Sequence, residues 1–214
     1  MVDFKANLSG DDRVLEVVLL RHGETAGNLA GRYVGRTDEP LHEEARRCLR
    51  EAGKFTGASN ILVSPLQRAG ETARLLFPGV ELEVCQDLRE MDFGDFEGRT
   101  AEELDDDPAY EEWVEGGCTG PCPGGEGLEQ FSERTCAAFD LAVRQSVSRK
   151  EGHMIVVTHG GSIMAIMNRY ARPRRPCFSW YVKNCCGYRI RLDGRRWATD
   201  PSFLEYARWE LFNR

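Results

Sequence analysis

The sequence of 214 residues contains no apolar run that approaches the roughly 20 residues needed to cross a membrane. Its first twelve residues are polar and charged, with no apolar stretch of signal-peptide length. Basic residues are scarce, since 28 Lys and Arg face 35 Asp and Glu, and the net charge of −7 disfavours nucleic acids and anionic membranes as partners. We therefore expect a cytoplasmic protein that folds as one domain over residues 1–214.

The cysteines also lack a zinc-binding pattern, because none of the eight pairs with another at the usual two-residue gap. Cys118 and Cys122 could supply two metal ligands, and Cys185 and Cys186 two more. Without an export signal, reduced thiols packed as small apolar groups are the simpler interpretation. The sequence therefore predicts neither a metal site nor a disulfide framework.

Three apolar segments, residues 14–20, 60–63 and 154–158, are typical of buried strands. Amphipathic segments of helix length lie between them, and this alternation predicts a mostly parallel sheet with helices on both faces. The fold class expected is α/β, a three-layer α/β/α sandwich with an antiparallel edge strand and an inserted helical and loop cap.

Local signals refine this outline. Residues 43–55 have the amphipathic pattern of one helix, and Ser64 followed by Pro65 predicts the start of another, with the hydroxyl as cap. Apolar and Arg side chains alternate over residues 188–192, and the following Asp-Gly pair predicts a hairpin turn into a strand over 195–199. This hairpin is the expected antiparallel edge.

The segment from about residue 99 to 128 differs from the rest of the chain. No Lys or Arg occurs between Thr100 and Thr119, and a loop rich in Gly, Pro and Cys follows. The eight acidic residues of this stretch are Glu102, Glu103, Asp105, Asp106, Asp107, Glu111, Glu112 and Glu115. We interpret the segment as an insertion that covers the end of the sheet, and a solvated acidic helix face is the alternative.

Two of the predicted strands end in a histidine and a glycine. Arg21-His22-Gly23 follows the first strand, His159-Gly160 follows the third, and Arg68 follows the second. Ligands of open α/β sheets bind at the carboxyl ends of the strands, where free N–H groups at helix starts attract phosphate. The pattern predicts a cationic phosphate pocket that contains a histidine nucleophile.

These residues resemble the histidine phosphatase superfamily, also called the phosphoglycerate-mutase-like family. The first signature is Arg-His-Gly-Glu at residues 21–24, and a second histidine, His159, stands where the family has one. Further matching blocks, in family order, are residues 31–38, 64–69 and 89–94. The resemblance extends from about residue 14 to 192.

The resemblance implies a role for each matching residue. His22 would attack phosphorus, and Glu90 would protonate the leaving oxygen and then activate water. The catalytic set that it implies is Arg21, His22, Arg68, Glu90 and His159. The phosphate-binding set that it implies is Arg21, Asn28, Arg68, His159 and Gly160. Neither a metal nor a cofactor is implied, because the arginines supply the positive charge.

Each of these residues also has a structural interpretation. A histidine after a strand is often a packing residue, Arg68 could be a surface arginine of a helix, and Glu90 could be a turn carboxylate. His42 and His153 keep that structural interpretation, one near a helix start and the other at a strand start. A non-catalytic domain that binds phosphorylated ligands is the alternative to an enzyme.

Several positions separate this chain from the mutase branch of the family. That branch has a hydroxyl residue at Val34, an Arg at Met91, a Tyr at Phe93 and an Asn at Gly161, and its insertion is basic. The blocks at residues 90–98 and 124–131 are similar instead to phosphatases, above all α-ribazole phosphatases. The resemblance therefore implies a phosphomonoesterase that forms a phosphohistidine on His22 and is similar to an α-ribazole 5′-phosphate phosphatase, acting on a small phosphorylated metabolite. A broad-specificity phosphatase and a phosphoglycerate mutase are the alternatives.

Aromatic residues flank the predicted acid, and they suggest how a substrate could be held. Phe93, Phe96, Tyr110 and Trp113 could form an apolar lid that stacks on a flat leaving group, or they could simply pack the insertion onto the sheet. The sequence leaves the oligomeric state open, with a homodimer as one option.

Overall fold

The computed structural model describes residues 14–52, 55 and 58–212, so the polar segment 1–12 lies outside the described residues. Within these residues, six strands form one sheet in the order β3-β2-β4-β1-β5-β6. The strands are β1 Val14–Arg21, β2 Ile61–Val63, β3 Leu82–Val84, β4 His153–Thr158, β5 Cys186–Asp193 and β6 Glu205–Glu210. The first four pair in parallel, and β5 pairs antiparallel with both β1 and β6. The predicted α/β class with an antiparallel edge is confirmed.

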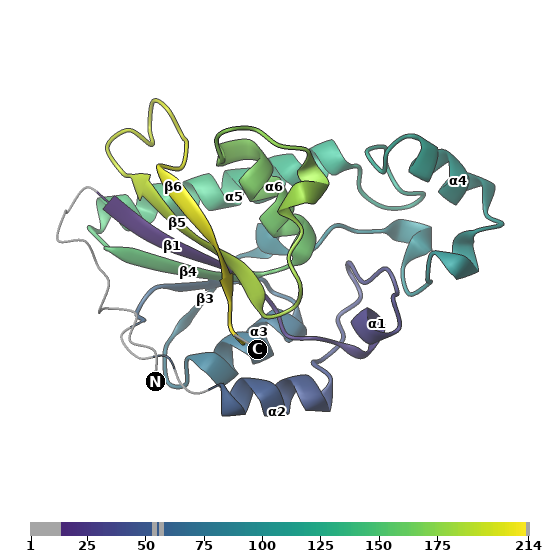
Figure 1. Ribbon diagram of the computed structural model, residues 1–214, viewed down its shortest axis with the longest axis horizontal. Helices are drawn as coiled ribbons and strands as arrows, with labels where there is room; N and C mark the ends of the chain where they lie inside the picture. The colour runs from purple at the N-terminus through teal and green to yellow at the C-terminus, as the bar shows by residue number, and fades with distance from the viewer. Residues whose placement is uncertain (1–13, 53–54, 56–57, 213–214) are drawn as a thin grey trace.

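Helices cover both faces of this sheet, with α2 and α3 on one face and α5 and α6 on the other (Figure 1). The helices are α1 Ala26–Leu29, α2 Glu43–Glu51, α3 Gln67–Leu76, α4 Pro108–Glu115, α5 Leu128–Ser148 and α6 Gly160–Tyr170. Short 3₁₀ turns are η2 Gln86–Leu88, η3 Gly94–Phe96, η4 Glu102–Leu104 and η5 Cys177–Trp180.

The alternation of side chains along β1 divides the core in two. Val18 and Leu20 pack with Leu49 of α2 and Leu76 of α3 in one buried cluster. The neighbouring residues Leu15, Val17 and Leu19 belong to a second cluster, which includes the inward faces of α5 and α6. Because successive strand residues point to opposite faces, one β-branched and leucine-rich strand supports both layers.

Three local predictions are wrong. The helix predicted over residues 43–55 ends at Glu51, and Ser64 does not cap α3, whose N-cap residue is Leu66. The strand predicted over residues 195–199 is a turn, because the Asp193 carboxylate accepts the backbone N–H groups of Arg195 and Arg196. The true partner of β5 is β6, which follows this longer connection.

The insertion consists of η4, α4 and a loop that leads into α5. It lies at the end of the molecule remote from the start of β1 (Figure 1). The loop is tied back to α4 because the Trp113 indole donates to the Gly120 carbonyl at 3.1 Å. Asp107 caps α4 through its side chain, and Pro108 occupies the first turn, as helix starts favour.

Candidate active site

The site is built on the carboxyl ends of three neighbouring strands. The His22 N–H donates to the Thr158 carbonyl at 2.9 Å, and the Ser64 N–H donates to the Val157 carbonyl at 3.0 Å. These two hydrogen bonds continue the ladders of β1 and β2 with β4 by one residue. As a result, the residues that follow the three strands, His22, Ser64 and His159, lie side by side.

His22 is held as a neutral imidazole with one nitrogen bearing the proton. Its Nδ1 bonds the Gly23 carbonyl at 2.6 Å, and its Nε2 accepts the Arg68 Nε–H at 3.3 Å. A carbonyl only accepts and a guanidinium only donates, so the proton lies on Nδ1 and the lone pair on Nε2. Burial, and then the charges of Arg68 and Arg21, lower the pKa of His22 well below its ordinary 6.5.

His159 is fully buried next to His22, with ring centroids 5.1 Å apart. Its Nε2 bonds the Ser64 hydroxyl at 2.6 Å. Because that oxygen already accepts the Leu66 N–H, the hydroxyl proton can point at Nε2, which leaves Nδ1 as the protonated donor. Burial and the nearby Arg68 cation lower the pKa of His159 as well. Ser64 thus orients a histidine of the site.

Arg68 is a fully buried cation in the first turns of α3. Besides bonding His22, its guanidinium donates to the carbonyls of Thr37 at 2.7 Å and Gly35 at 2.9 Å. It also donates to the Val34 carbonyl at 3.3 Å. Arg68 therefore joins the nucleophile loop to the loop of residues 34–37, so it is not a surface arginine.

Arg21 and Gly160 also meet at this site. A Cβ atom built on Gly160 would lie 3.4 Å from the Arg21 Cζ, so the guanidinium lies against the start of α6. Arg21 Nη1 donates to the Val182 carbonyl at 2.9 Å. Among the described residues, neither the buried Arg21 Nε nor His159 Nδ1 has a hydrogen-bond partner. Both N–H groups can therefore donate to a ligand that enters the site.

Asn28 lies in the short helix α1 behind the nucleophile loop. Its Oδ1 accepts the Thr25 N–H at 3.3 Å and the Asn184 Nδ2 at 3.0 Å. These bonds occupy the carbonyl end of the side-chain amide and leave the NH₂ end as a donor. Asn184 Nδ2 also donates to the His22 carbonyl at 3.1 Å, so one side chain steadies both residues.

Glu90 joins this group from the irregular segment before the insertion. Its carboxylate accepts the Gly161 N–H at 2.9 Å and the Met91 N–H at 3.0 Å. A Cβ atom on Gly161 would lie 2.3 Å from Glu90 Oε1, so a larger residue at 161 would require the carboxylate to shift. The structure thus brings together all the predicted site residues, and their chemical roles stay predictions.

Several residues that support the site were absent from the sequence predictions. Asn184 is one, and Thr72 of α3 is another, because its buried hydroxyl accepts the Gly23 N–H at 2.9 Å. Arg134 and Glu126 form an ion pair at 2.6 Å beneath Glu90. Of these, only Glu126 lay in a block that matched the family pattern, and nothing in the pattern marked it as a partner of Arg134.

The aromatic residues of the insertion mostly pack against one another. Phe96 and Trp113 belong to the buried core, so they cannot stack on a substrate. Phe93 and Tyr110 are half-buried, and both lie beside Tyr33 at centroid distances of 5.1 and 6.0 Å. The lid of four rings expected from the sequence is therefore wrong for two of its members.

The described part of the chain holds neither a metal-binding cluster nor a membrane-spanning helix. All eight cysteines are free thiols. Among residues 14–52, 55 and 58–212, no group of three or more His, Cys, Asp or Glu side chains could hold a metal ion. Nor does any helix in the described part of the chain have the length and apolarity to span a membrane.

The two buried histidines should make stability fall in mild acid. Above about pH 6.5 both folded and unfolded chains hold neutral imidazoles, whereas below it the unfolded chain binds protons that the native state resists. Each histidine then lowers the free energy of unfolding by about 1.4 kcal/mol per pH unit, down to its own native pKa. Urea unfolding at pH 5 to 7.5 should show a shallower dependence in the variant His22→Asn/His159→Asn than in wild type.

The matched control for this measurement is His42→Asn, because His42 is exposed at the start of α2. Its unfolding free energy should follow the wild-type pH dependence. Parallel curves for wild type and the double variant would contradict the prediction.

Three known proteins are similar to this chain in sequence or in structure. An acid phosphatase of Mycobacterium tuberculosis is 32% identical over 162 residues, 73% of this chain and 75% of that protein. A phosphoglycerate mutase-like protein of Arabidopsis thaliana is 30% identical over 211 residues, 92% of this chain and 90% of that protein. The crystal structure of an α-ribazole phosphatase from Shigella flexneri matches with a TM-score of 0.70 and 26% identity, covering 82% of this chain and 89% of that chain.

The family model that matches is the histidine phosphatase superfamily, branch 1, and it covers residues 17–201. This range includes both places where a strand is followed by a histidine and a glycine, and it includes Arg68 and Glu90. The chain therefore belongs to the histidine phosphatase superfamily, as the sequence resemblance implied, and it is an enzyme of the phosphatase class.

Proposed function

We propose that the protein is a phosphomonoesterase that transfers the phosphoryl group of its substrate first to His22 and then to water. The observation that supports this most directly is the state of His22, which is buried and neutral, with an unprotonated Nε2 that accepts a hydrogen bond from Arg68 Nε. A histidine nucleophile must be neutral to attack phosphorus. Here burial and two cations keep it neutral at pH values where an exposed histidine begins to protonate.

In this mechanism, oxygens of the substrate phosphate accept hydrogen bonds from buried donors of the site. Arg21 Nε and His159 Nδ1, both buried and unpartnered among the described residues, would donate to them, together with the Asn28 NH₂ group. Arg68 Nε would move its hydrogen bond from His22 Nε2 to a phosphoryl oxygen as Nε2 forms its bond to phosphorus. Fixed cations aimed at the equatorial oxygens stabilise the charge of the transition state.

Glu90 would act as the proton carrier of both half-reactions. Protonated, it gives its proton to the substrate oxygen as the P–O bond breaks and the P–N bond to His22 forms. Ionised, it then takes a proton from the water that attacks the phosphohistidine, which releases phosphate and restores the free His22. Its place beside Gly161, at the start of the helix that follows His159, supports this role.

We propose α-ribazole 5′-phosphate, a flat benzimidazole nucleotide, as the substrate. The similarity to an α-ribazole phosphatase supports this choice, as do the half-buried rings of Phe93 and Tyr33 beside the loop that Arg68 holds. Transfer between phosphoglycerates fits less well, because the stretch from Thr100 to Thr119 holds no cation. The acidic residues of this stretch would repel a small, highly anionic substrate.

The test compares kcat/KM for α-ribazole 5′-phosphate, 3-phosphoglycerate and p-nitrophenyl phosphate in wild type. A preference for the nucleotide of more than about 100-fold, or about 2.7 kcal/mol, would support the substrate assignment. Similar low efficiencies on all three would leave a broad-specificity phosphatase. Conversion of 3-phosphoglycerate to 2-phosphoglycerate without release of phosphate would overturn the phosphatase proposal.

A further inference from the structure

We propose that Arg134 is a positioning residue that sets where the Glu90 carboxylate lies, through the backbone on which Glu90 is carried. The inference rests on the proposed role of Glu90 as proton carrier. Arg134 lies in α5, and among the described residues it makes no hydrogen bond to His22 or to Arg68. Its charge helps to lower the pKa of His159, and all its hydrogen bonds go to Glu126 and to the backbone at Asp87, Arg89 and Glu90. Its positional effect on the reaction would therefore pass through Glu90.

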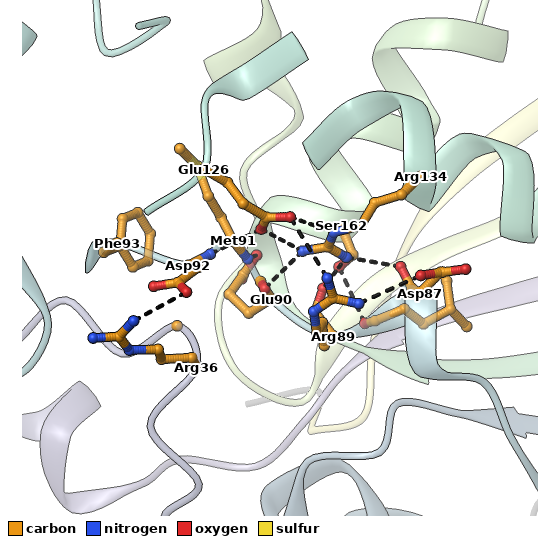
Figure 2. A network of polar contacts seen from close by, with 12 residues as sticks. Arg36, Asp87, Arg89, Glu90, Met91, Asp92, Phe93, Glu126, Arg134 and Ser162 are labelled. Atoms are coloured by element: carbon orange, nitrogen blue, oxygen red, sulfur yellow. Dashed lines mark hydrogen bonds and ion pairs between the residues drawn. The ribbon is translucent and has the colours of Figure 1, made fainter. Parts of the chain in front are cut away.

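The Arg134 side chain alone binds three backbone carbonyls. Arg134 Nη1 donates to the carbonyls of Asp87 at 2.8 Å and Arg89 at 2.9 Å, and Nη2 donates to the Glu90 carbonyl at 3.0 Å. The contacts are drawn in Figure 2. The Arg134 side chain is 12% exposed, and its bonds to the Arg89 and Glu90 carbonyls are part-buried, so water competes little for these two carbonyls. Charge-assisted hydrogen bonds of this kind are the strong ones.

Glu126 completes the arrangement from the end of the insertion. It bonds Arg134 through both carboxylate oxygens, to Nε at 2.7 Å and to Nη2 at 2.6 Å. Its Oε2 also accepts the Asp92 N–H at 3.0 Å, and its own N–H donates to the Asp92 carbonyl at 2.8 Å. The Arg134–Glu126 pair therefore binds the chain before Glu90 and after it.

This segment needs such support because regular structure does not provide it. Residues 89–93 lie between the 3₁₀ turns η2 and η3 and belong to neither a helix nor a strand. Backbone groups in such a segment must find partners elsewhere or lose hydrogen-bond energy on burial. Arg134 and Glu126 supply partners for four backbone groups of this segment, the carbonyls of Arg89 and Glu90 and both backbone groups of Asp92. The Glu90 carboxylate then reaches the Gly161 N–H.

Loss of this support should affect proton transfer more than phosphoryl binding. A general acid works only within hydrogen-bond reach of the leaving oxygen, and small displacements are costly. An alkoxide leaving group depends on that proton, whereas p-nitrophenolate is stable enough to leave without it. Impaired positioning of Glu90 should therefore make kcat/KM depend more steeply on the pKa of the leaving group.

The experiment measures kcat/KM of Arg134→Gln for an alkyl phosphate and for p-nitrophenyl phosphate. We expect a loss of about 30-fold or more on the alkyl ester and less than about 3-fold on the aryl ester. The matched control is Arg144→Gln, because Arg144 lies on the same helix, is exposed and, within the described part of the chain, bonds only Asp140. This control should change neither value.

Glu90→Gln separates the inference from the proposed function on which it rests. If Glu90→Gln lowers both substrates equally, Glu90 is not the proton carrier and the proposed mechanism fails with the inference. Suppose that Glu90→Gln lowers kcat/KM for the alkyl ester much more than for the aryl ester. If Arg134→Gln then lowers kcat/KM equally for both esters, or for neither, only the positioning role is overturned.

Two milder variants cover the case in which Arg134→Gln does not fold. Arg134→Lys keeps the charge but cannot make the paired bonds to Glu126, and Glu126→Gln keeps the three Arg134 bonds to backbone carbonyls. Each variant should lower kcat/KM for the alkyl ester more than for the aryl ester, and by less than Arg134→Gln does. Equal losses on both esters in these folded variants would also overturn the positioning role.

Discussion

Replacing His22 by alanine is expected to lower kcat/KM for p-nitrophenyl phosphate by at least about 10⁴-fold, because no other group takes over its bond to phosphorus. Rapid quenching of wild type with a radiolabelled phosphate ester should trap an acid-labile phosphoryl group on the protein, and His22→Ala should trap none. The cations of the pocket stay in place, so substrate binding should weaken far less than turnover.

His42→Ala is the matched control for this variant, since that histidine is exposed and lies outside the site. Circular dichroism and thermal unfolding of both variants exclude a loss of fold. If His22→Ala kept more than a tenth of the wild-type activity, the nucleophile would have to be another residue.

Replacing Arg68 by methionine is expected to cost about 10³-fold in kcat/KM, since one buried cation stabilises the phosphoryl charge and also holds the nucleophile. Arg68→Lys should recover little, because an ammonium group cannot reach His22 and the carbonyls of Gly35 and Thr37 together. Arg74→Met is the matched control, since Arg74 lies exposed in the last turn of the same helix.

The pH profile of Arg68→Met should carry a second signature of the same contact. After burial, the Arg68 charge is the main influence that lowers the pKa of His22 in the native enzyme. Without this cation the imidazole takes up a proton at a higher pH. The acid limb of kcat/KM should therefore move to higher pH than in wild type, whereas a shift to lower pH or no shift would contradict the contact.

The sequence predicted the strands that carry the site because those strands are buried on both faces. A mostly apolar run such as residues 14–20 indicates a strand that is buried on both faces, and the glycines that follow such strands indicate where they end. The weak elements were missed for the opposite reason. β3 has only three residues with two of them exposed, and β6 alternates without a clear apolar face, so neither shows a burial signal.

The chemical groups of the site were predictable, but their supports were not. Arg134 lies among helix residues where an arginine normally extends into solvent, and only the fold shows that it meets Glu126 and the backbone at 87–90. Ser64 was interpreted as a helix cap, which is what a Ser-Pro pair usually indicates, yet its hydroxyl bonds His159. A local sequence pattern does not show when a residue distant in the sequence takes the hydrogen bond that the pattern assigns to a neighbour.

The side chains that hold this site bind mostly main-chain atoms. Arg68 binds the carbonyls of residues 34, 35 and 37, and Arg134 binds those of residues 87, 89 and 90. A carbonyl is the same whatever side chain its residue bears, so Val34 and Thr37 can be exchanged in evolution without loss of their backbone bonds to Arg68. Mutational drift at these positions would change what the pocket accepts and preserve how it reacts, which allows one chemistry to diversify into many specificities.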